Sequence, residues 1–378
     1  MKAIYLQFIL GLLFLTACSN ETPERSIAHR TVLVYVAGDN NLSAYGKRNI
    51  QSMINGAGSN HLNGGNLVVY YDAADAAPLL LQVKVGNEGT AYTDTLQRYP
   101  EQNSMDPQVM REVIHEVQSA FPAQKQGLVL WSHGTAWLPY PLSNYLRSFG
   151  DDQGEVLSID ELASALPDHT FDFILFDACY MGSWEVLYAL RNKADYLIAS
   201  PTEVLADGFV YDYILQPMFQ QPADLEQVCR LFYNHYNSLT GLSRSGAIAL
   251  YDLQALPALA ACCQTILQDQ AEALLQVSPS EVQAVDYLSA YHHFLFDLAD
   301  VVRQVATDPD YEAFEQALQQ VIRYKATTPY ITFGYSGNPQ IAMQHYSGLS
   351  LYLPQSNHAK LNDWYSRETA WGRLLSGL

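Results

Sequence analysis

Apolar residues in this chain fall into short unbroken runs, separated by stretches with helical spacing. The runs predict strands at residues 31–37, 67–72, 128–131, 173–176, 196–200 and 246–251, and a hairpin at 79–85 and 91–96. An unbroken apolar run is typical of a strand buried on both faces, as in a parallel sheet. Residues 106–121 have the spacing of an amphipathic helix, and Ser158 with Glu161 predicts a capping box at the start of another. The alternation predicts an α/β fold with a mostly parallel central sheet flanked by helices.

The C-terminal third has a different pattern. It is mainly helical, with a long helix expected from residue 253 to 275 and later strands at 328–335 and 348–353. No linker rich in Pro, Gly or Ser precedes it. We therefore expect residues 31–253 to form the core and residues 254–378 to form an α/β extension packed on it. The sequence leaves open whether this extension is a separate domain.

Two of the predicted strands end in a reactive side chain. The run at residues 128–131 leads to His133, and the run at 173–176 leads to Cys179. The carboxyl ends of parallel strands meet at one edge of a sheet, where functional groups collect. A lone histidine or cysteine is more often structural than catalytic. Together, however, these two predict an imidazole and a thiol in one crevice, the pair that cysteine-based hydrolysis requires.

Three segments resemble the clostripain family of cysteine peptidases. They are Tyr-Val-Ala-Gly-Asp-Asn-Asn-Leu at 35–42, His-Gly-Thr-Ala-Trp at 133–137 and Asp-Ala-Cys-Tyr-Met at 177–181. The resemblance covers roughly residues 31 to 375. The chain departs from the family at Ala136, where a second glycine is common, and at 208–211, where it has Gly-Phe-Val-Tyr in place of Gly-Trp-Pro-Tyr. The family shares a caspase-like fold with gingipains, legumains and separases, so the resemblance implies a three-layer caspase-like sandwich.

The resemblance also implies an endopeptidase that cleaves after Arg, and less readily after Lys. His133 would be the base and acid, Cys179 the nucleophile, and backbone N–H groups near Gly134 and Cys179 the oxyanion hole. A helix is expected at residues 181–191. Its N-terminal dipole would lower the pKa of the Cys179 thiol.

A pocket for Arg needs a carboxylate at its base. Asp207, in the segment 201–208, is the first candidate, and an ordinary turn residue beside Gly208 is the alternative interpretation. Asp177 is the second candidate, because it lies two residues before Cys179 and points to the same side of the strand. Glu203 is a lesser candidate.

The segment 134–157 is long for a connection in a compact α/β domain, which favours a functional loop. Arg147 is the only Lys or Arg between Lys125 and Arg191. Members of the family are made as single chains and cut themselves in this region. We therefore expect self-cleavage between Arg147 and Ser148, giving a monomer of two chains. A solvated Arg on an inert loop is the alternative.

The N-terminus has the pattern of a lipoprotein export signal. Lys2 precedes an apolar stretch at residues 3–15, and Leu-Thr-Ala-Cys at 15–18 is a lipobox. Residues 1–17 are thus a predicted signal peptide, Cys18 the lipidated residue and residues 18–30 a tether. This implies a protein of the bacterial cell envelope, anchored in the outer membrane or at the cell surface, or else secreted.

The net charge of −19 argues against nucleic acid as a partner and favours cationic peptides, although it also serves solubility. No metal-binding spacing of Cys or His is present, so no cofactor is expected. Part of the family depends on calcium. The acidic segment 151–155 lacks a complete calcium-loop pattern, and a solvated turn is the favoured interpretation.

Two functions of different classes therefore compete. One is a surface-anchored, Arg-directed cysteine endopeptidase acting on proteins or peptides. The other is a catalytically silent lipoprotein that binds peptide or glycan on the same fold. The presence of both His133 and Cys179 at strand ends favours the enzyme.

Overall fold

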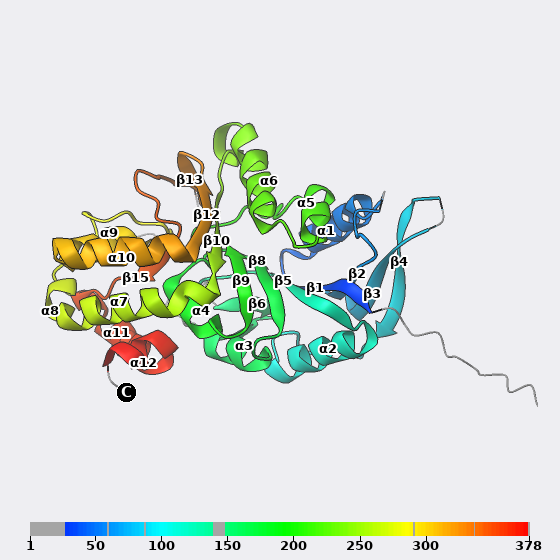
Figure 1. Ribbon diagram of the computed structural model, residues 1–378, viewed down its shortest axis with the longest axis horizontal. Helices are drawn as coiled ribbons and strands as arrows, with labels where there is room; N and C mark the ends of the chain where they lie inside the picture. Colours follow the sequence, from blue (N-terminus) through cyan, green and yellow to red (C-terminus); the bar gives the residue numbers. More distant parts are fainter. Residues whose placement is uncertain are drawn as a thin grey trace, which may run out of the picture.

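The fold is built on one nine-stranded sheet with the strand order β12-β10-β9-β8-β5-β1-β2-β3-β4 (Figure 1). The computed structural model describes residues 27–58, 60–86, 88–138, 148–289, 292–335 and 337–376. Cys18 and Arg147 therefore lie outside the described residues. The strands of this sheet are β1 (Ala28–Gly38), β2 (Asn66–Ala73), β3 (Ala76–Val85), β4 (Ala91–Arg98), β5 (Ala123–Trp131), β8 (Phe171–Asp177), β9 (Ala194–Ala199), β10 (Ala247–Asp252) and β12 (Ile322–Thr327).

The centre of the sheet is parallel and its two margins are antiparallel. Strands β9, β8, β5, β1 and β2 run in the same direction. On one margin β10 and β12 pair in antiparallel fashion, and on the other β3 and β4 do. Smaller two-stranded sheets are formed by β6 (Phe149–Asp152) with β7 (Glu155–Leu157), β11 (Leu295–Asp297) with β15 (Ser350–Tyr352), and β13 (Tyr330–Thr332) with β14 (Gln340–Ala342).

Helices cover both faces of the sheet. One face carries α1 (Ser43–Gly56), α5 (Tyr211–Met218) and α6 (Leu225–Ser238). The remaining α-helices pack with the opposite face or with the C-terminal extension: α2 (Pro107–Ala120), α3 (Ile159–Ala165), α4 (Trp184–Leu190), α7 (Leu256–Asp269), α8 (Ala271–Leu274), α9 (Leu298–Val305), α10 (Asp308–Val321), α11 (Ala359–Glu368) and α12 (Ala370–Ser376). Figure 1 shows α2 and α3 across the sheet from α1 and α5. The predicted three-layer α/β sandwich is confirmed.

Successive side chains of a strand point to opposite faces of the sheet, so one apolar run contributes to the hydrophobic cores on both faces. In β1, Val32, Val34 and Val36 belong to the core under α1, α5 and α6. Leu33 and Tyr35 belong to the core on the other face. Every one of these side chains is at most 3% exposed. This two-sided burial is the reason that the strand has no polar positions between residues 31 and 37.

Several local predictions hold and others do not. The hairpin β3–β4 and the capping box of Ser158 with Glu161 are confirmed. The expected strand at 328–335 is wrong for most of its length, because only Tyr330–Thr332 is strand. The pattern missed β12, which pairs with β10 and so extends the main sheet into the C-terminal third. The single helix expected at 253–275 is broken into η2 (Leu253–Ala255), α7 and α8.

Among the helices that the structure describes, none combines the length and the apolarity needed to cross a membrane.

Gly127 is required where β5 passes β8. It lies opposite Phe173 in the strand register, and a Cβ at this position would lie 2.5 Å from the Cζ atom of the Phe173 ring. We predict that Gly127→Ala lowers the free energy of unfolding by about 1 to 3 kcal/mol, because the fully buried ring must move. Urea unfolding followed by tryptophan fluorescence measures the change.

Gly58→Ala is the matched control, since a Cβ there would meet no atom closer than 3.6 Å. Equal unfolding midpoints for the two variants would contradict the steric explanation.

Candidate active site

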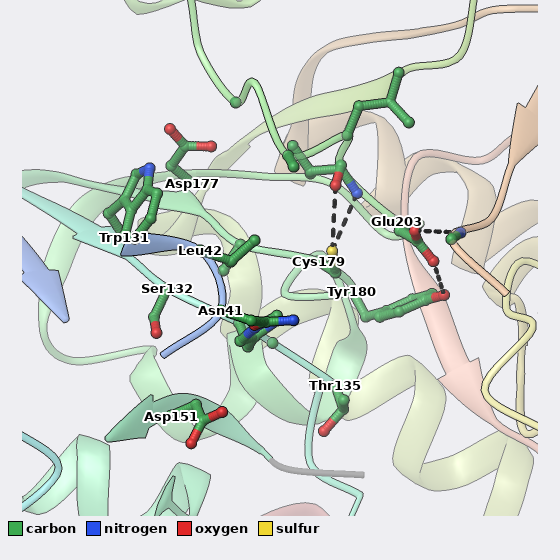
Figure 2. Close-up of a pocket in the computed structure, with 18 of the residues that line it drawn as sticks. Asn41, Leu42, Trp131, Ser132, Thr135, Asp151, Asp177, Cys179, Tyr180 and Glu203 are labelled. Carbon is green, nitrogen blue, oxygen red and sulfur yellow. Dashed lines mark hydrogen bonds between the residues drawn. The ribbon is translucent and has the colours of Figure 1, made fainter. Parts of the chain in front are cut away.

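A cleft of about 700 Å³ opens at the carboxyl edge of the sheet (Figure 2). Its walls come from parts of the chain that are far apart in sequence. They are the start of the α1 segment (Asn41, Leu42), the ends of β5 (Trp131, Ser132, His133, Gly134, Thr135) and β8 (Asp177, Ala178, Cys179, Tyr180), Asp151, the loop after β9 (Glu203, Val204, Leu205, Ala206, Gly208) and the C-terminal extension (Tyr287, Leu288, Gly334, Tyr335).

The pairing of β5 with β8 brings His133 and Cys179 into this cleft. The two strands are parallel, and Trp131 lies opposite Asp177 at the last pair of the register. His133 and Cys179 each follow two residues later, so they leave the sheet at the same level. The backbones also meet beyond the sheet, because a Cβ on Gly134 would lie 2.4 Å from the carbonyl oxygen of Cys179. Only glycine permits this approach.

The thiol of Cys179 is held by the backbone of the loop after β9. The Sγ atom donates to the carbonyl oxygen of Val204 at 3.4 Å and accepts from the Val204 N–H at 3.3 Å (Figure 2). Burial raises the pKa of this thiol well above its ordinary value, and the charge of Glu203 raises it further. Both effects disfavour the thiolate.

The expected lowering of this pKa by a helix dipole is therefore wrong. Helix α4 begins at Trp184, and its N-cap Ser183 accepts the N–H of Val186. Tyr180, with a φ of 63°, turns the chain between Cys179 and the helix. The helix start thus lies several residues beyond the thiol, and its dipole falls off within the first turn.

The imidazole of His133 is oriented by Asn41. Its Nε2 atom lies 2.7 Å from the Oδ1 atom of Asn41. The backbone from His133 to Thr135 is held by the segment around the start of β6, which follows the long loop. Gly150 N–H donates to the carbonyl of His133 at 2.9 Å, and Thr135 N–H donates to the carbonyl of Ser148 at 3.0 Å. Ser148 is therefore fixed within two residues of the histidine.

Of the three candidate carboxylates for a basic side chain, Asp177 and Glu203 line the cleft, and Asp207 does not. Asp177 is 4% exposed, and its Oδ2 atom accepts from Phe209 N–H at 3.2 Å and from the Tyr211 hydroxyl at 2.9 Å. Burial raises its pKa to about 6. The backbone of Gly208 presses against this carboxylate, since a Cβ there would lie 2.7 Å from both oxygens.

Asp207 lies on the solvent side of the same loop. Its side chain is 75% exposed and contacts Arg48 at 3.4 Å. It is not among the residues that line the cleft. The geometry therefore favours Asp177 over Asp207, the reverse of the order expected from the sequence.

Glu203 ties the loop after β9 to the C-terminal extension. Its Oε1 atom accepts from Gly334 N–H at 2.6 Å, and its Oε2 atom accepts from the Tyr180 hydroxyl at 3.3 Å (Figure 2). Burial raises the pKa of this carboxyl as well. Glu203 thus lies beside the thiol with both of its oxygens engaged.

The carboxylates of the acidic segment after the long loop accept hydrogen bonds from backbone N–H groups. Asp151 accepts from Gly154 N–H at 2.9 Å, and the buried Asp152 accepts from Ser104 N–H at 2.5 Å. Within the described part of the chain, no group of three or more His, Cys, Asp or Glu side chains is arranged to hold a metal ion.

Sequence reasoning gave no role to several residues of the cleft. Asn41 was visible only as part of a family motif, and the Val204 backbone carries no side-chain signal at all. Tyr287, Leu288 and Tyr335 come from the extension, more than a hundred residues beyond Cys179. Their proximity depends on how the extension packs, which no local pattern encodes.

The comparisons with known proteins agree on one family. Residues 34–372 match the sequence profile of the clostripain family. The structure of an inactive zymogen C11 protease from Parabacteroides distasonis is 41% identical, covers 93% of this chain and 99% of that chain, and superposes with a TM-score of 0.85. A secreted C11 cysteine protease from Bacteroides thetaiotaomicron, in complex with an irreversible peptide inhibitor, is 29% identical, with coverages of 93% and 100% and a TM-score of 0.80.

Clostripain of Hathewaya histolytica is 31% identical over 128 residues, which are 30% of this chain. The match spans about a quarter of that relative, 24% of its length.

Burial of the sulfur and the charge of Glu203 predict slow alkylation of Cys179. In an Arg147→Ala variant, which lacks the expected cleavage point, iodoacetamide at pH 7 should modify Cys179 at least about tenfold more slowly than Cys262, although both residues are half-buried. The reason is that alkylation requires the thiolate, which burial disfavours. Peptide mass mapping over time measures both rates in one sample.

Unfolding in urea should bring the two rates together, because it exposes the Cys179 thiol to water and separates it from the charge of Glu203. Faster modification of Cys179 than of Cys262 in the folded chain would contradict the prediction.

Proposed function

The chain belongs to the clostripain family of cysteine proteases, and on that premise we propose that it cleaves peptide bonds after Arg, and less readily after Lys, through a dyad of Cys179 and His133. It is a cysteine endopeptidase rather than a silent binding protein. The observation that carries the proposed dyad is the register of β5 with β8, since both side chains follow a paired strand end by two residues and line one cleft.

The reaction follows from the chemistry of the two side chains. His133 takes the thiol proton, and Sγ of Cys179 attacks the carbonyl carbon of the scissile bond. Backbone N–H groups near Gly134 and Cys179 donate to the oxyanion that forms. His133 then gives its proton to the leaving amine, so that the C–N bond breaks and an acyl-thioester remains. Water, deprotonated by His133, hydrolyses this ester and regenerates the thiol.

The resting geometry must change before this reaction can start. The thiol has to turn away from the Val204 backbone, and the imidazole has to keep its orientation through Asn41. The backbone of a bound substrate can then replace Sγ as the hydrogen-bonding partner of the Val204 N–H and carbonyl groups. This requirement fits a chain that is made inactive, as the C11 zymogen of Parabacteroides distasonis is.

Selectivity for a basic residue is supported by Asp177. A guanidinium that reaches its carboxylate forms a buried, charge-assisted hydrogen bond. At pH 7 a carboxyl with a pKa of about 6 is mostly ionised, and a bound cation ionises it further. Asp207 remains a second contributor within the proposal, acting from the exposed end of the loop. The net charge of −19 favours the approach of cationic peptides.

Self-cleavage between Arg147 and Ser148 is the proposed activation step. The bond between Thr135 and Ser148 supports it, because it holds the segment after the cut close to His133. The two products would stay together. Strands β1, β2 and β5 would belong to the light chain and β8, β9 and β10 to the heavy chain, all in one sheet. No cofactor is needed for the dyad, and calcium dependence stays a prediction from the resemblance.

The proposal places the enzyme in the bacterial cell envelope, attached through lipid on Cys18. The lipobox at residues 15–18 is its basis. A relative from Bacteroides thetaiotaomicron is secreted, which agrees with export of this chain.

We expect Cys179→Ala to abolish both hydrolysis and self-cleavage. Turnover of an Arg-amide fluorogenic peptide should fall by at least about 10³-fold, because one half of the nucleophile–base unit is gone. The variant should run as one band, whereas the wild type gives a heavy chain whose N-terminal residue is Ser148. His133→Ala should behave in the same way. Arg147→Ala should also stay as one band but keep reduced or delayed hydrolysis.

Cys262→Ala is the matched control and should be cut and active like the wild type. More than a tenth of wild-type activity in Cys179→Ala would overturn the dyad. A wild-type protein that is uncut and fully active would contradict only the proposed activation by self-cleavage, and the dyad would stand.

Asp177→Asn should reduce kcat/KM for an Arg peptide by about 30-fold or more, since a buried charge pair that loses one partner costs roughly 2 to 5 kcal/mol. The loss for an isosteric citrulline peptide should be much smaller. Because the raised pKa means that Asp177 takes up a proton as the pH falls through about 6, wild-type preference for Arg over citrulline should decline there. Asp177→Asn should lack this decline.

The exposed Asp207 provides the comparison, and Asp207→Asn should change the preference by a few-fold at most. A larger selective loss in Asp207→Asn than in Asp177→Asn would restore the order expected from the sequence.

A further inference from the structure

The C-terminal extension gives the cleft an apolar wall. Tyr287, Leu288 and Tyr335 line the same cleft as Cys179, and all three are only half-buried. The rings of Tyr287 and Tyr335 lie 5.5 Å apart, and Tyr287 also contacts the buried Phe333 at 5.9 Å between centroids. Exposed aromatic surface inside a concave site is typical of ligand recognition.

The wall is anchored at both of its segments. Asp286, which is fully buried, accepts the backbone N–H groups of Leu288, Phe294 and Leu295. Tyr335 follows Gly334, whose N–H is bonded to Glu203. These bonds fix the backbone on each side of the aromatic rings. An apolar ligand would therefore meet a surface that needs little ordering on binding.

The wall lies away from the carboxylate that the proposed function assigns to Arg. Figure 2 shows Asp177 and Glu203 on opposite sides of Cys179. Since Glu203 bonds to Gly334, the aromatic wall belongs to the Glu203 side. A peptide whose Arg side chain reaches Asp177 can therefore present a neighbouring side chain to the wall.

The chain's own expected cleavage sequence has suitable side chains. Residues 142–147 are Leu-Ser-Asn-Tyr-Leu-Arg, so Tyr145 and Leu146 directly precede Arg147. Large apolar side chains at these two positions match an apolar wall that lies in the same cleft as the Asp177 carboxylate.

We propose that Tyr287, Leu288 and Tyr335 form a subsite for a large apolar side chain, aromatic or branched, at one of the two substrate positions before the cleaved Arg. The proposal rests on the peptidase function above. It makes the enzyme selective for an apolar residue followed by a basic one, and it gives the C-terminal extension a direct part in choosing substrates.

Four fluorogenic peptides test this subsite without any residue after the scissile bond. They are acetyl-Tyr-Leu-Arg, acetyl-Ser-Leu-Arg, acetyl-Tyr-Ser-Arg and acetyl-Ser-Ser-Arg, each as the aminomethylcoumarin amide. For the wild type we expect kcat/KM to be at least about tenfold higher for the Tyr-Leu peptide than for the Ser-Ser peptide. The two mixed peptides identify which position the wall reads.

Tyr287→Ala and Tyr335→Ala should each reduce this ratio by about tenfold, because they remove ring surface from the wall. Tyr287→Phe should keep the ratio, since the ring and not the hydroxyl makes the contact. Tyr330→Ala is the matched control, because Tyr330 lies in the same extension, is 53% exposed and does not line the cleft. Thermal unfolding of every variant, compared with Tyr330→Ala, checks that the extension is folded.

The outcomes separate the two proposals. If the wild type cleaves all four Arg peptides within threefold of one another, the subsite falls and the Arg-directed function stands. If the ratio is high but unchanged in both alanine variants, the preference arises elsewhere and the subsite also falls. If the wild type cleaves none of the Arg peptides, the proposed function falls, and the subsite falls with it.

Discussion

The parallel pairing of β5 with β8 is the constraint on which the candidate site depends. Its register sets Trp131 against Asp177, and the chain beyond each strand carries one of the two reactive side chains. The pairing continues past the sheet as a close approach between Gly134 and the Cys179 carbonyl. Buried, close-packed strands have little freedom to shift, so the core sets where the two side chains leave the sheet, and contacts with Asn41 and Val204 then orient the imidazole and the thiol.

The thiol in the resting site is held by ordinary backbone contacts. Val204 occupies both hydrogen-bonding directions of the thiol, and Glu203 adds a negative charge beside it. Burial and the charge of Glu203 oppose formation of the thiolate, whereas the hydrogen bond from the Val204 N–H favours it, and the net effect raises the pKa of the thiol. Glu203 also bonds to Gly334, which couples this loop to the C-terminal extension. A movement of either segment therefore alters the environment of Cys179.

The C-terminal third is structurally part of the enzyme. Strand β12 adds to the main sheet through β10, and Tyr287 and Tyr335 complete the cleft. The cleft thereby combines a buried carboxylate at Asp177, an apolar wall and the thiol of Cys179. A cleft with both surfaces can recognise a motif of two residues, because the carboxylate binds a basic side chain and the wall binds an apolar one.

Sequence alone determined the elements whose cause is local. The runs at 31–37, 128–131 and 173–176 predict central strands because two-sided burial favours apolar side chains on both faces of a strand. The Ser158 capping box is likewise local, and the strand ends indicated His133 and Cys179. Only the tertiary structure decided the rest. Strand β12 was missed because Arg323 and Lys325 interrupt its apolar pattern at the edge of the sheet. The burial of Asp177, the exposure of Asp207 and the contacts of Val204 and Tyr287 depend on how distant segments pack, and that packing is a property of the whole fold.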